Sequence, residues 1–303
     1  MNESMYKYMK VGIIHFMAFP GTMKGEGDVE ETVKRIAADD YFNAIEITWI
    51  KDTDTRKRVK HMLDTSHMTV AYGAQPRLLT TGLNINDLDE AGRKNAVMSM
   101  KEGIDEAYEM GAKGFAFLSG TYQEDRKEEA FSALVKSTKE LCAYAKEKGN
   151  LKLVLEIFDY NIDKKSLIGP VDLAKRFAAE IRKEYENFGL MVDLSHIPLI
   201  GETAEESILP IKEYLVHAHM GNCVVKSKDL PAYGDNHPRF GFPGSENDVA
   251  ELAHFLKVLM DVGFLNTDNP PIVSFEVKPF KDEDPGIVIA NAKRTLNEAW
   301  ARI

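Results

Sequence analysis

Residues 152–158 read KLVLEIF, a short apolar run that carries one acidic residue, Glu156, near its end. Three later runs have the same design: FGLMVDL at 188–194, YLVHAHM at 214–220 and IVSFEVK at 272–278. Near-continuous apolar runs of this length are typical of strands that are buried on both faces, as in a parallel sheet. We therefore predict four buried strands in the second half of the chain.

The same pattern continues toward the N-terminus, with candidate strands at 11–17, 43–50, 68–74 and 112–118. Between the runs lie longer segments, such as 89–110, 128–149 and 171–189, whose apolar residues recur at three- and four-residue intervals. Eight strands that alternate with helices predict a single (β/α)8 TIM barrel over residues 1–303. A doubly wound open sheet would show the same alternation, but the turn HFMAFPGTMKGEG lacks the GxGxxG fingerprint of such folds.

Composition limits the classes of function. The chain has 303 residues, 44% of them hydrophobic and 28% charged, which is typical of a globular protein and excludes disorder. A net charge of −10 disfavours nucleic-acid binding, because the protein surface would repel phosphates. Two cysteines cannot form a disulfide framework, and no run of about 18 apolar residues predicts a membrane span. We expect a cytoplasmic protein without nucleic-acid or membrane partners.

One polar residue occurs near the end of each of the last four strands: Glu156, Asp193, His219 and Glu276. In (β/α)8 barrels the chemistry occurs at these strand ends. A single strand-end carboxylate is often a cap or an ion-pair member, and a single histidine is often a core residue. Four such groups on adjacent strands instead suggest one shared divalent ion, since buried charges need a partner. Three oxygen donors and one nitrogen favour Mn²⁺, Mg²⁺ or Co²⁺, with Zn²⁺ also compatible.

These residues, with His196 three positions after Asp193 and His219 within HAHMGN, resemble the xylose-isomerase-like barrel superfamily. The similarity is greatest to its sugar isomerase and ketose 3-epimerase branch. The resemblance implies that the four residues bind one divalent ion and that Glu156 and Glu276 form an acid–base pair. It also implies proton transfer through a metal-stabilised enediolate, with His196 in contact with substrate oxygens.

The chain departs from the epimerase pattern at two positions. Ile162 replaces an acidic residue six positions after Glu156, and Val225 replaces an arginine six positions after His219. Neighbouring polar residues are therefore candidates for substrate binding. They are Asp159, Lys226 and Asn222, the last of which closes the HAHMGN motif.

A long segment rich in Gly, Pro and Asn, residues 222–249, separates the last two strands and predicts a loop over the barrel mouth. His237 and Arg239 within it are candidates for binding a carboxylate, phosphate or oxo group, although they could instead attach the loop to the barrel. His217 is expected to be a core residue. His15, Phe16, Glu46, Trp49 and Tyr72 could line a sugar pocket from the first three strands; they could also be packing residues.

The leading hypothesis is a metal-dependent sugar or keto-sugar isomerase or epimerase. The alternative is a metal-dependent lyase on an oxo-sugar derivative, such as a decarboxylase or a subunit that cleaves C-glycosides, and the loop with His237 and Arg239 favours it. An apurinic-site endonuclease fits the fold but not the negative charge. A non-catalytic sugar-binding barrel would have no use for the paired glutamates. The expected partner is a small sugar; a homo-oligomer or a small partner subunit is compatible with the sequence.

Overall fold

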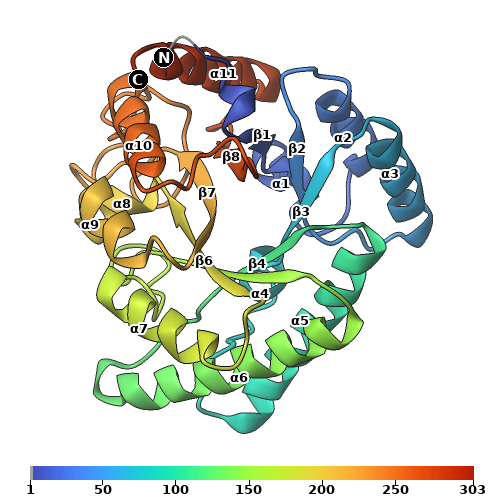
Figure 1. The fold of residues 1–303 in the computed structure, drawn as a ribbon, viewed down its shortest axis with the longest axis vertical. Coiled ribbons are helices and arrows are strands. Elements are labelled where there is room, and N and C mark those ends of the chain that lie inside the picture. The colour runs from blue at the N-terminus through green and yellow to red at the C-terminus, as the bar shows by residue number, and fades with distance from the viewer. Residues whose placement is uncertain (1–2) are drawn as a thin grey trace.

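Eight parallel strands surround a common axis in the computed structural model, which describes residues 3–303 (Figure 1). The strands are β1 (Lys10–Ile13), β2 (Ala44–Ile47), β3 (Thr69–Gly73), β4 (Gly114–Leu118), β5 (Lys152–Glu156), β6 (Phe188–Asp193), β7 (Leu215–Gly221) and β8 (Ile272–Glu276). Hydrogen-bonded neighbours follow the order β1-β8-β7-β6-β5-β4-β3-β2. The predicted (β/α)8 barrel is confirmed, and all eight strands lie within their predicted segments or within one residue of them.

The barrel closes least regularly between β1 and β2. Only a bridge between Ile14 and Glu46 and a hydrogen bond from the Asn43 amide to the Val11 carbonyl (2.9 Å) join these strands in the described residues. The other neighbouring pairs have between two residues in register, in β3 with β4, and five, in β4 with β5. The sheet is therefore a nearly closed barrel with a seam at β1–β2.

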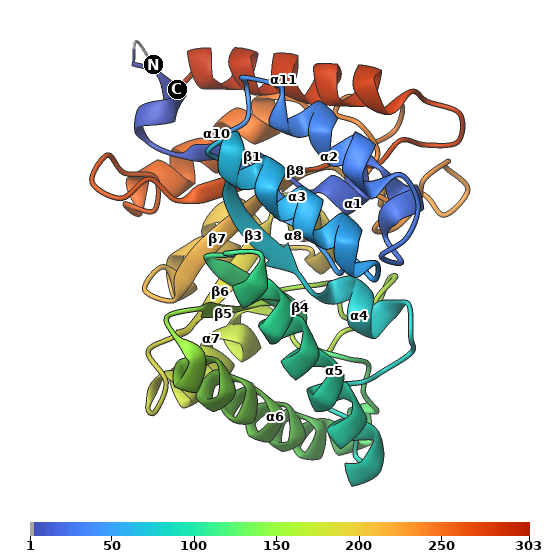
Figure 2. The ribbon, with the colours of Figure 1, turned by 90° about the vertical axis from the view of Figure 1, so that its right-hand side faces the viewer.

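Helices follow the strands, and most of them cover the outside of the barrel, as the view along its side shows (Figure 2). They are α1 (His15–Ala18), α2 (Val29–Ala37), α3 (Thr53–Thr65), α4 (Gln75–Leu79), α5 (Glu90–Glu109), α6 (Lys127–Lys148), α7 (Val171–Arg182), α8 (His196–Ile200), α9 (Ala204–Ile208), α10 (Val249–Asp261) and α11 (Pro285–Ala301). Capping residues set several starts: Asp52 accepts from the Thr55 amide, and Asp284 precedes Pro285 and accepts from Ile287. No helix in residues 3–303 combines the length and apolar character needed to cross a membrane.

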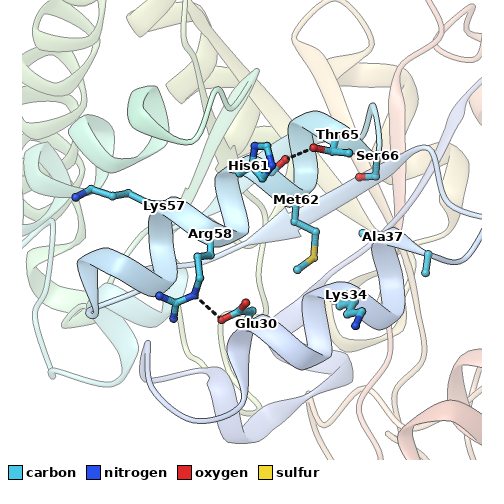
Figure 3. A pocket seen from close by; sticks show the side chains of 10 residues that line it. Glu30, Lys34, Ala37, Lys57, Arg58, His61, Met62, Thr65 and Ser66 are labelled. Carbon is cyan, nitrogen blue, oxygen red and sulfur yellow. Dashed lines mark hydrogen bonds and ion pairs between the residues drawn. The ribbon is translucent and has the colours of Figure 1, made fainter.

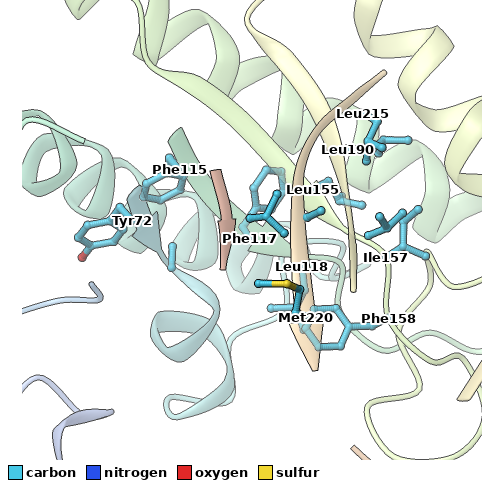
Figure 4. Packing of buried hydrophobic residues seen from close by; sticks show 14 of the residues in the cluster. Tyr72, Phe115, Phe117, Leu118, Leu155, Ile157, Phe158, Leu190, Leu215 and Met220 are labelled. Atoms are coloured by element: carbon cyan, nitrogen blue, oxygen red, sulfur yellow. The ribbon is translucent and has the colours of Figure 1, made fainter. Parts of the chain in front are cut away.

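The core lies between the strands and the helices that cover them. Aromatic and aliphatic side chains fill it, among them Phe117, Leu155 and Met220 (Figure 4). The rings of Tyr72 and Phe115 stack with centroids 5.5 Å apart. All six residues of β6 are buried, as expected for a strand of a parallel sheet with both faces covered.

The first predicted strand, 11–17, extends too far. The chain turns at the barrel mouth after Ile13, and His15–Ala18 forms α1 instead. The amides of Met17 and Ala18 both donate to the Ile14 carbonyl, which curls this apolar segment into a helical turn. Periodicity could not distinguish the two forms, because the segment is buried whichever conformation it adopts.

Candidate metal centre

Four side chains meet at the C-terminal mouth of the barrel. Glu156, Asp193 and Glu276 are the last residues of β5, β6 and β8, and His219 lies near the end of β7. Each offers one ligand atom, and these four atoms all lie within 4.8 Å of one another. All four residues are buried, with Glu276 the most exposed at 7%. The parallel register brings the strand ends to one level, so the four side chains share a single space.

The four atoms that face this space lack hydrogen-bond partners within residues 3–303: Glu156 Oε1, Asp193 Oδ2, His219 Nδ1 and Glu276 Oε2. His219 Nδ1 lies 2.8 Å from Glu276 Oε2 and 3.3 Å from Glu156 Oε1. Burial and the nearby Glu156 carboxylate raise the pKa of Glu276 to about 7, although His237 and His219 oppose the shift. Crowded, buried and unpaired oxygens of this kind are unfavourable without a cation, so the residues fit a divalent ion.

Glu46, on β2, orients the histidine of this group. Its Oε1 lies 3.2 Å from His219 Nε2 and 2.7 Å from His217 Nε2. Burial opposes ionisation of Glu46, but the two histidines outweigh it and hold the pKa of this carboxyl well below its usual range. With Nε2 facing Glu46, Nδ1 of His219 faces the three carboxylates and would offer its lone pair to a bound ion. A carboxylate behind a histidine is the usual arrangement around metal-binding imidazoles.

Other polar groups hold the outer oxygens of the carboxylates. Gln75 Nε2 donates to Glu156 Oε2 at 2.7 Å, and the Ser195 amide donates to Asp193 Oδ1 at 2.6 Å. Gly221 approaches the same group closely: a Cβ there would lie 3.0 Å from Asp193 Oδ1. The inner oxygens, Glu156 Oε1 and Asp193 Oδ2, face the shared space and are therefore free for a ligand. The outer oxygens, Glu156 Oε2 and Asp193 Oδ1, fix the two side chains in place.

A second polar cluster adjoins the first. Asp235 Oδ1 lies 2.8 Å from His237 Nε2 and 3.2 Å from His196 Nε2, and its Oδ2 lies 3.0 Å from Lys164 Nζ. His237 Nε2 also lies 3.4 Å from Glu276 Oε1, which connects the two clusters. Burial disfavours charged imidazoles here, but Asp235 and other carboxylates raise the pKa of His196 to about 10 and that of His237 to about 9. Both histidines are therefore poised to donate hydrogen bonds to oxygen atoms.

The two clusters line a cavity of about 170 Å³ at the barrel mouth. Its polar floor contains Glu46, Glu156, His219, Asp235, His237 and Glu276, and its apolar wall contains Ile14, Phe16, Met17, Met23, Pro76, Leu79 and Phe158. Gln75, Lys164 and Lys278 complete the lining. A cavity below the usual 300–1,000 Å³ of drug-sized sites suits a small ligand.

A larger hollow of about 720 Å³ lies on the outside of the barrel between α2 and α3 (Figure 3). Glu30, Arg58 and Met62 are among its lining residues, and Arg58 pairs with Glu30 at 2.7 Å. It has no group of metal-ligating side chains among the described residues. We therefore place the functional site at the barrel mouth.

Two predicted substrate contacts, His196 and His237, lie beside the metal centre. His237 lines the cavity, whereas His196 lies behind it, with its Nδ1 bonded to the Ile157 carbonyl at 2.8 Å and its ring against Phe158. Among the residues considered for the first strands, Phe16 and Glu46 line the cavity. His15 instead bonds Thr32, and burial lowers its pKa to about 3.

Asp159 does not reach the cavity, contrary to the sequence prediction. Its carboxylate accepts hydrogen bonds from the amides of Ile162, Asp163 and Lys164, each at 2.8 Å. Both oxygens are therefore used to fold the loop after β5, and the side chain is fully buried. Asp159 therefore stabilises the loop and is absent from the cavity lining.

Asn222, Lys226 and Arg239 also point elsewhere. Asn222 crosslinks the loop after β7: its side chain bonds Arg239 O and Ser245 Oγ, each at 2.9 Å. Lys226 Nζ donates to the Ser245 carbonyl at 2.8 Å. Arg239 pairs with Glu283 at 3.0 Å. These residues attach the loop to itself and to the barrel rim, which was the alternative interpretation of Arg239.

Sequence reasoning missed Asp235, Lys164 and Gln75. Asp235 precedes the predicted His237 by two positions in DNHPRFG, so the acid–histidine spacing was a usable signal. Lys164 and Gln75 carry no such signal, because their positions depend on how the loop after β5 and the turn after β3 fold.

Several solved structures resemble this chain over almost its whole length. Among solved structures, D-psicose 3-epimerase with D-tagatose from Clostridium cellulolyticum H10 aligns with a TM-score of 0.70 and 16% identity, over 97% of this chain and 99% of that one. The IOLI protein with a bound zinc atom aligns with a TM-score of 0.71 and 17% identity, and 3-keto-D-glucoside 4-epimerase from E. coli with 0.67 and 14%; each alignment covers 97% of this chain and 99% of the other.

At these identities the structural likeness shows the shared fold. A search of curated proteins finds no match. The family profile described as xylose isomerase-like TIM barrel matches residues 34–294, most of the chain. The protein therefore belongs to the xylose isomerase-like TIM barrel family.

Proposed function

We propose that the protein is a divalent-metal-dependent isomerase or epimerase of a small sugar or keto-sugar. The observation that carries the proposal is the convergence of four unpartnered ligand atoms on one buried point, with two of them supplied by glutamates. Glu156, Asp193, His219 and Glu276 would hold the ion. Mn²⁺, Mg²⁺ and Co²⁺ suit the three oxygens and one nitrogen, and Zn²⁺ is compatible.

A bound divalent ion would stabilise negative charge on substrate oxygens when the neighbouring C–H group loses its proton. Glu156 and Glu276, on β5 and β8, are the candidate acid–base pair. One glutamate would accept the proton from the substrate carbon and the other would return a proton to it, which inverts the centre. Return to the neighbouring carbon would instead interconvert an aldose and a ketose.

The residues around Glu156 and Glu276 support the proposed acid–base roles of these two glutamates. Gln75 fixes the outer oxygen of Glu156, and His237 lies within 3.4 Å of the outer oxygen of Glu276. A histidine that donates a hydrogen bond would hold a substrate hydroxyl or the outer oxygen of Glu276. The apolar wall with Phe16, Met17 and Leu79 would exclude water from the reacting carbon.

The direct test is hydrogen exchange at carbon. Purified protein loaded with Mn²⁺, Co²⁺, Mg²⁺ or Zn²⁺ is incubated in D₂O with a panel of free ketoses and oxo-sugars, and NMR follows the C–H signals next to the carbonyl. We expect one C–H signal to disappear with at least one sugar and chelation to abolish the loss. A protein that binds its ion stoichiometrically yet exchanges no C–H in any sugar of the panel would contradict the proposal.

A further inference from the structure

The cavity at the barrel mouth has two unlike sides. Its polar floor contains three of the four proposed ligands, Glu156, His219 and Glu276. The side chains of its apolar wall carry no N–H group, no O–H group and no oxygen atom. A free sugar has hydroxyl groups around its whole ring, and a hydroxyl that faces such a wall loses its water without gaining a hydrogen bond. The part of the ligand that meets the wall should therefore be apolar.

The apolar wall is larger than the C–H face of one sugar ring requires. Its side chains come from the segments that follow three different strands. These are Ile14, Phe16, Met17 and Met23 after β1, Pro76 and Leu79 after β3, and Phe158 after β5. A single aromatic ring would cover the C–H face of a sugar, so a wall built from three segments can contact a further apolar group.

Part of the wall is separate from the main hydrophobic core. Ile14, Phe16 and Met17 form a small cluster of their own, and Met23 packs against it. The Phe16 ring lies against the end of β3, because a Cβ on Gly73 would be only 2.7 Å from the ring. These side chains therefore add little to the core of the barrel, and the surface that they leave open faces the cavity.

The wall reaches the protein surface at Leu79, which lines the cavity and is 48% exposed. With a volume of about 170 Å³, the cavity is too small to enclose a sugar together with a bulky substituent. An apolar substituent would instead extend across the rim and cover Leu79, which removes apolar surface from water and favours binding.

From this arrangement we propose that the cavity binds a glycoside of an oxo-sugar, with the sugar over the ligand set and an apolar aglycone on the apolar wall and across Leu79. The inference rests on the proposed function and narrows it. An aglycone blocks the anomeric carbon, so no aldehyde forms there and aldose–ketose interconversion is excluded at that end. The reaction is then epimerisation beside a ring ketone. A C–H bond breaks, one glutamate takes the proton, the electron pair moves into the carbonyl as an enolate, and the other glutamate returns a proton to the same carbon.

The first test measures binding without turnover. Phenyl and methyl glycosides of glucose, galactose, mannose and xylose, in both anomers, are titrated into the metal-loaded protein by calorimetry. The two members of a pair share their sugar, so the ratio of their dissociation constants reports the aglycone alone. We expect the phenyl member of at least one pair to bind about tenfold more tightly, because its ring buries apolar surface on the wall.

Variants locate the aglycone on the wall. Leu79→Ser should reduce the preference for phenyl by about threefold or more, since it replaces apolar surface at the rim by a hydroxyl. Leu209→Ser is the matched control, because Leu209 is 50% exposed but does not line the cavity. The control should keep the wild-type preference. An equal preference in Leu79→Ser and in the control would overturn the inference.

The second test separates this inference from the proposed function. C–H exchange in D₂O is compared for free ketoses and for phenyl and methyl glucosides oxidised to the ketone at C2, C3 or C4. We expect a phenyl compound to exchange with the highest kcat/KM. Exchange in free ketoses, without a phenyl preference in any pair, would overturn the inference and leave the proposed function intact. A phenyl preference that depends on Leu79, without exchange in any sugar, would support the aglycone site and contradict the proposed function.

Discussion

The two halves of the barrel contribute different chemistry to the mouth cavity. Strands β5 to β8 end in Glu156, Asp193, His219 and Glu276, the proposed ligand set. Strands β1 to β4 and the turns after them contribute mainly apolar side chains, among them Ile14, Phe16, Met17 and Leu79. Glu46 and Gln75 are the polar exceptions in the first half, and each supports a ligand from the second half.

In the proposed function, the two halves would meet two different requirements of proton transfer at carbon. The second half concentrates negative charge at a point, which needs a cation. The first half supplies low polarity, which strengthens every electrostatic interaction in the cavity because less water screens it. Changes in the two halves should therefore have effects of very different size.

The largest effect is expected for His219→Ala. The metal content of the purified wild-type protein should be about one divalent ion per chain, and the variant should lose the ion and all measurable activity, because the change removes one of the four proposed ligands and the only nitrogen among them. Elemental analysis checks this directly. His254→Ala, a change of an exposed histidine on α10, is the matched control and should keep the ion. Full metal content in His219→Ala would remove the basis of the ligand set.

The next effect is expected for Glu276→Gln. The amide keeps the size and one oxygen of the side chain but cannot accept a proton, so the turnover rate should fall by about 10²–10⁴-fold. Steady-state kinetics on a sugar found by the exchange assay measures it, with metal content determined in parallel. A variant that retains its ion and its full turnover rate would show that Glu276 does not transfer a proton in the reaction.

A smaller effect on metal affinity or activity is expected for changes of Gln75, a residue of the first half that bonds the proposed ligand Glu156. Gln75→Leu removes the hydrogen bond to Glu156 Oε2 while leaving the ligand set complete, and outer partners of this kind contribute about 10–100-fold in metal affinity or activity. Gln75→Glu would place a second carboxylate against Glu156 and should be worse. Unchanged metal affinity and unchanged kinetics in Gln75→Leu would show that Glu156 is held by packing alone.

The smallest effect is expected for the apolar wall. Leu79 is 48% exposed at the rim of the cavity, so Leu79→Ala removes apolar surface without leaving a buried void. We expect a change of about 2–10-fold in KM, since the side chain contributes about 1 kcal/mol of partial burial, with little change in kcat. A fall in turnover rate as large as that expected for Glu276→Gln would show that the two halves do not differ in their contribution to the reaction.

The sequence predicts that the four side chains of the second half converge, because a strand has a fixed period and a parallel barrel aligns strand ends. Glu156, Asp193, His219 and Glu276 needed only this regularity. His237 was a candidate because of its residue type, since an imidazole in a loop over the mouth can bind an anionic or oxo group, and it lines the cavity. Positions at the ends of regular strands can therefore be predicted from the sequence.

Loop residues were predicted poorly for a physical reason. Asp159 and Asn222 are polar and near the mouth, but loops contain backbone donors and acceptors that must be satisfied, and these two side chains satisfy them. Asp235 and Lys164 come from different loops and meet only after both have folded. Sequence spacing carries no information about such contacts, or about how far the first strand continues before α1.

The seam between β1 and β2 has a consequence for local motion. Amide protons exchange with solvent through local opening, and regions with few inter-strand hydrogen bonds open first. The amides that join β1 to β2 should therefore exchange with heavy water sooner than those that join β4 to β5. Glu46 bridges to Ile14 at this seam and contacts His219, so local opening of the barrel wall there would displace the imidazole of the proposed ligand set.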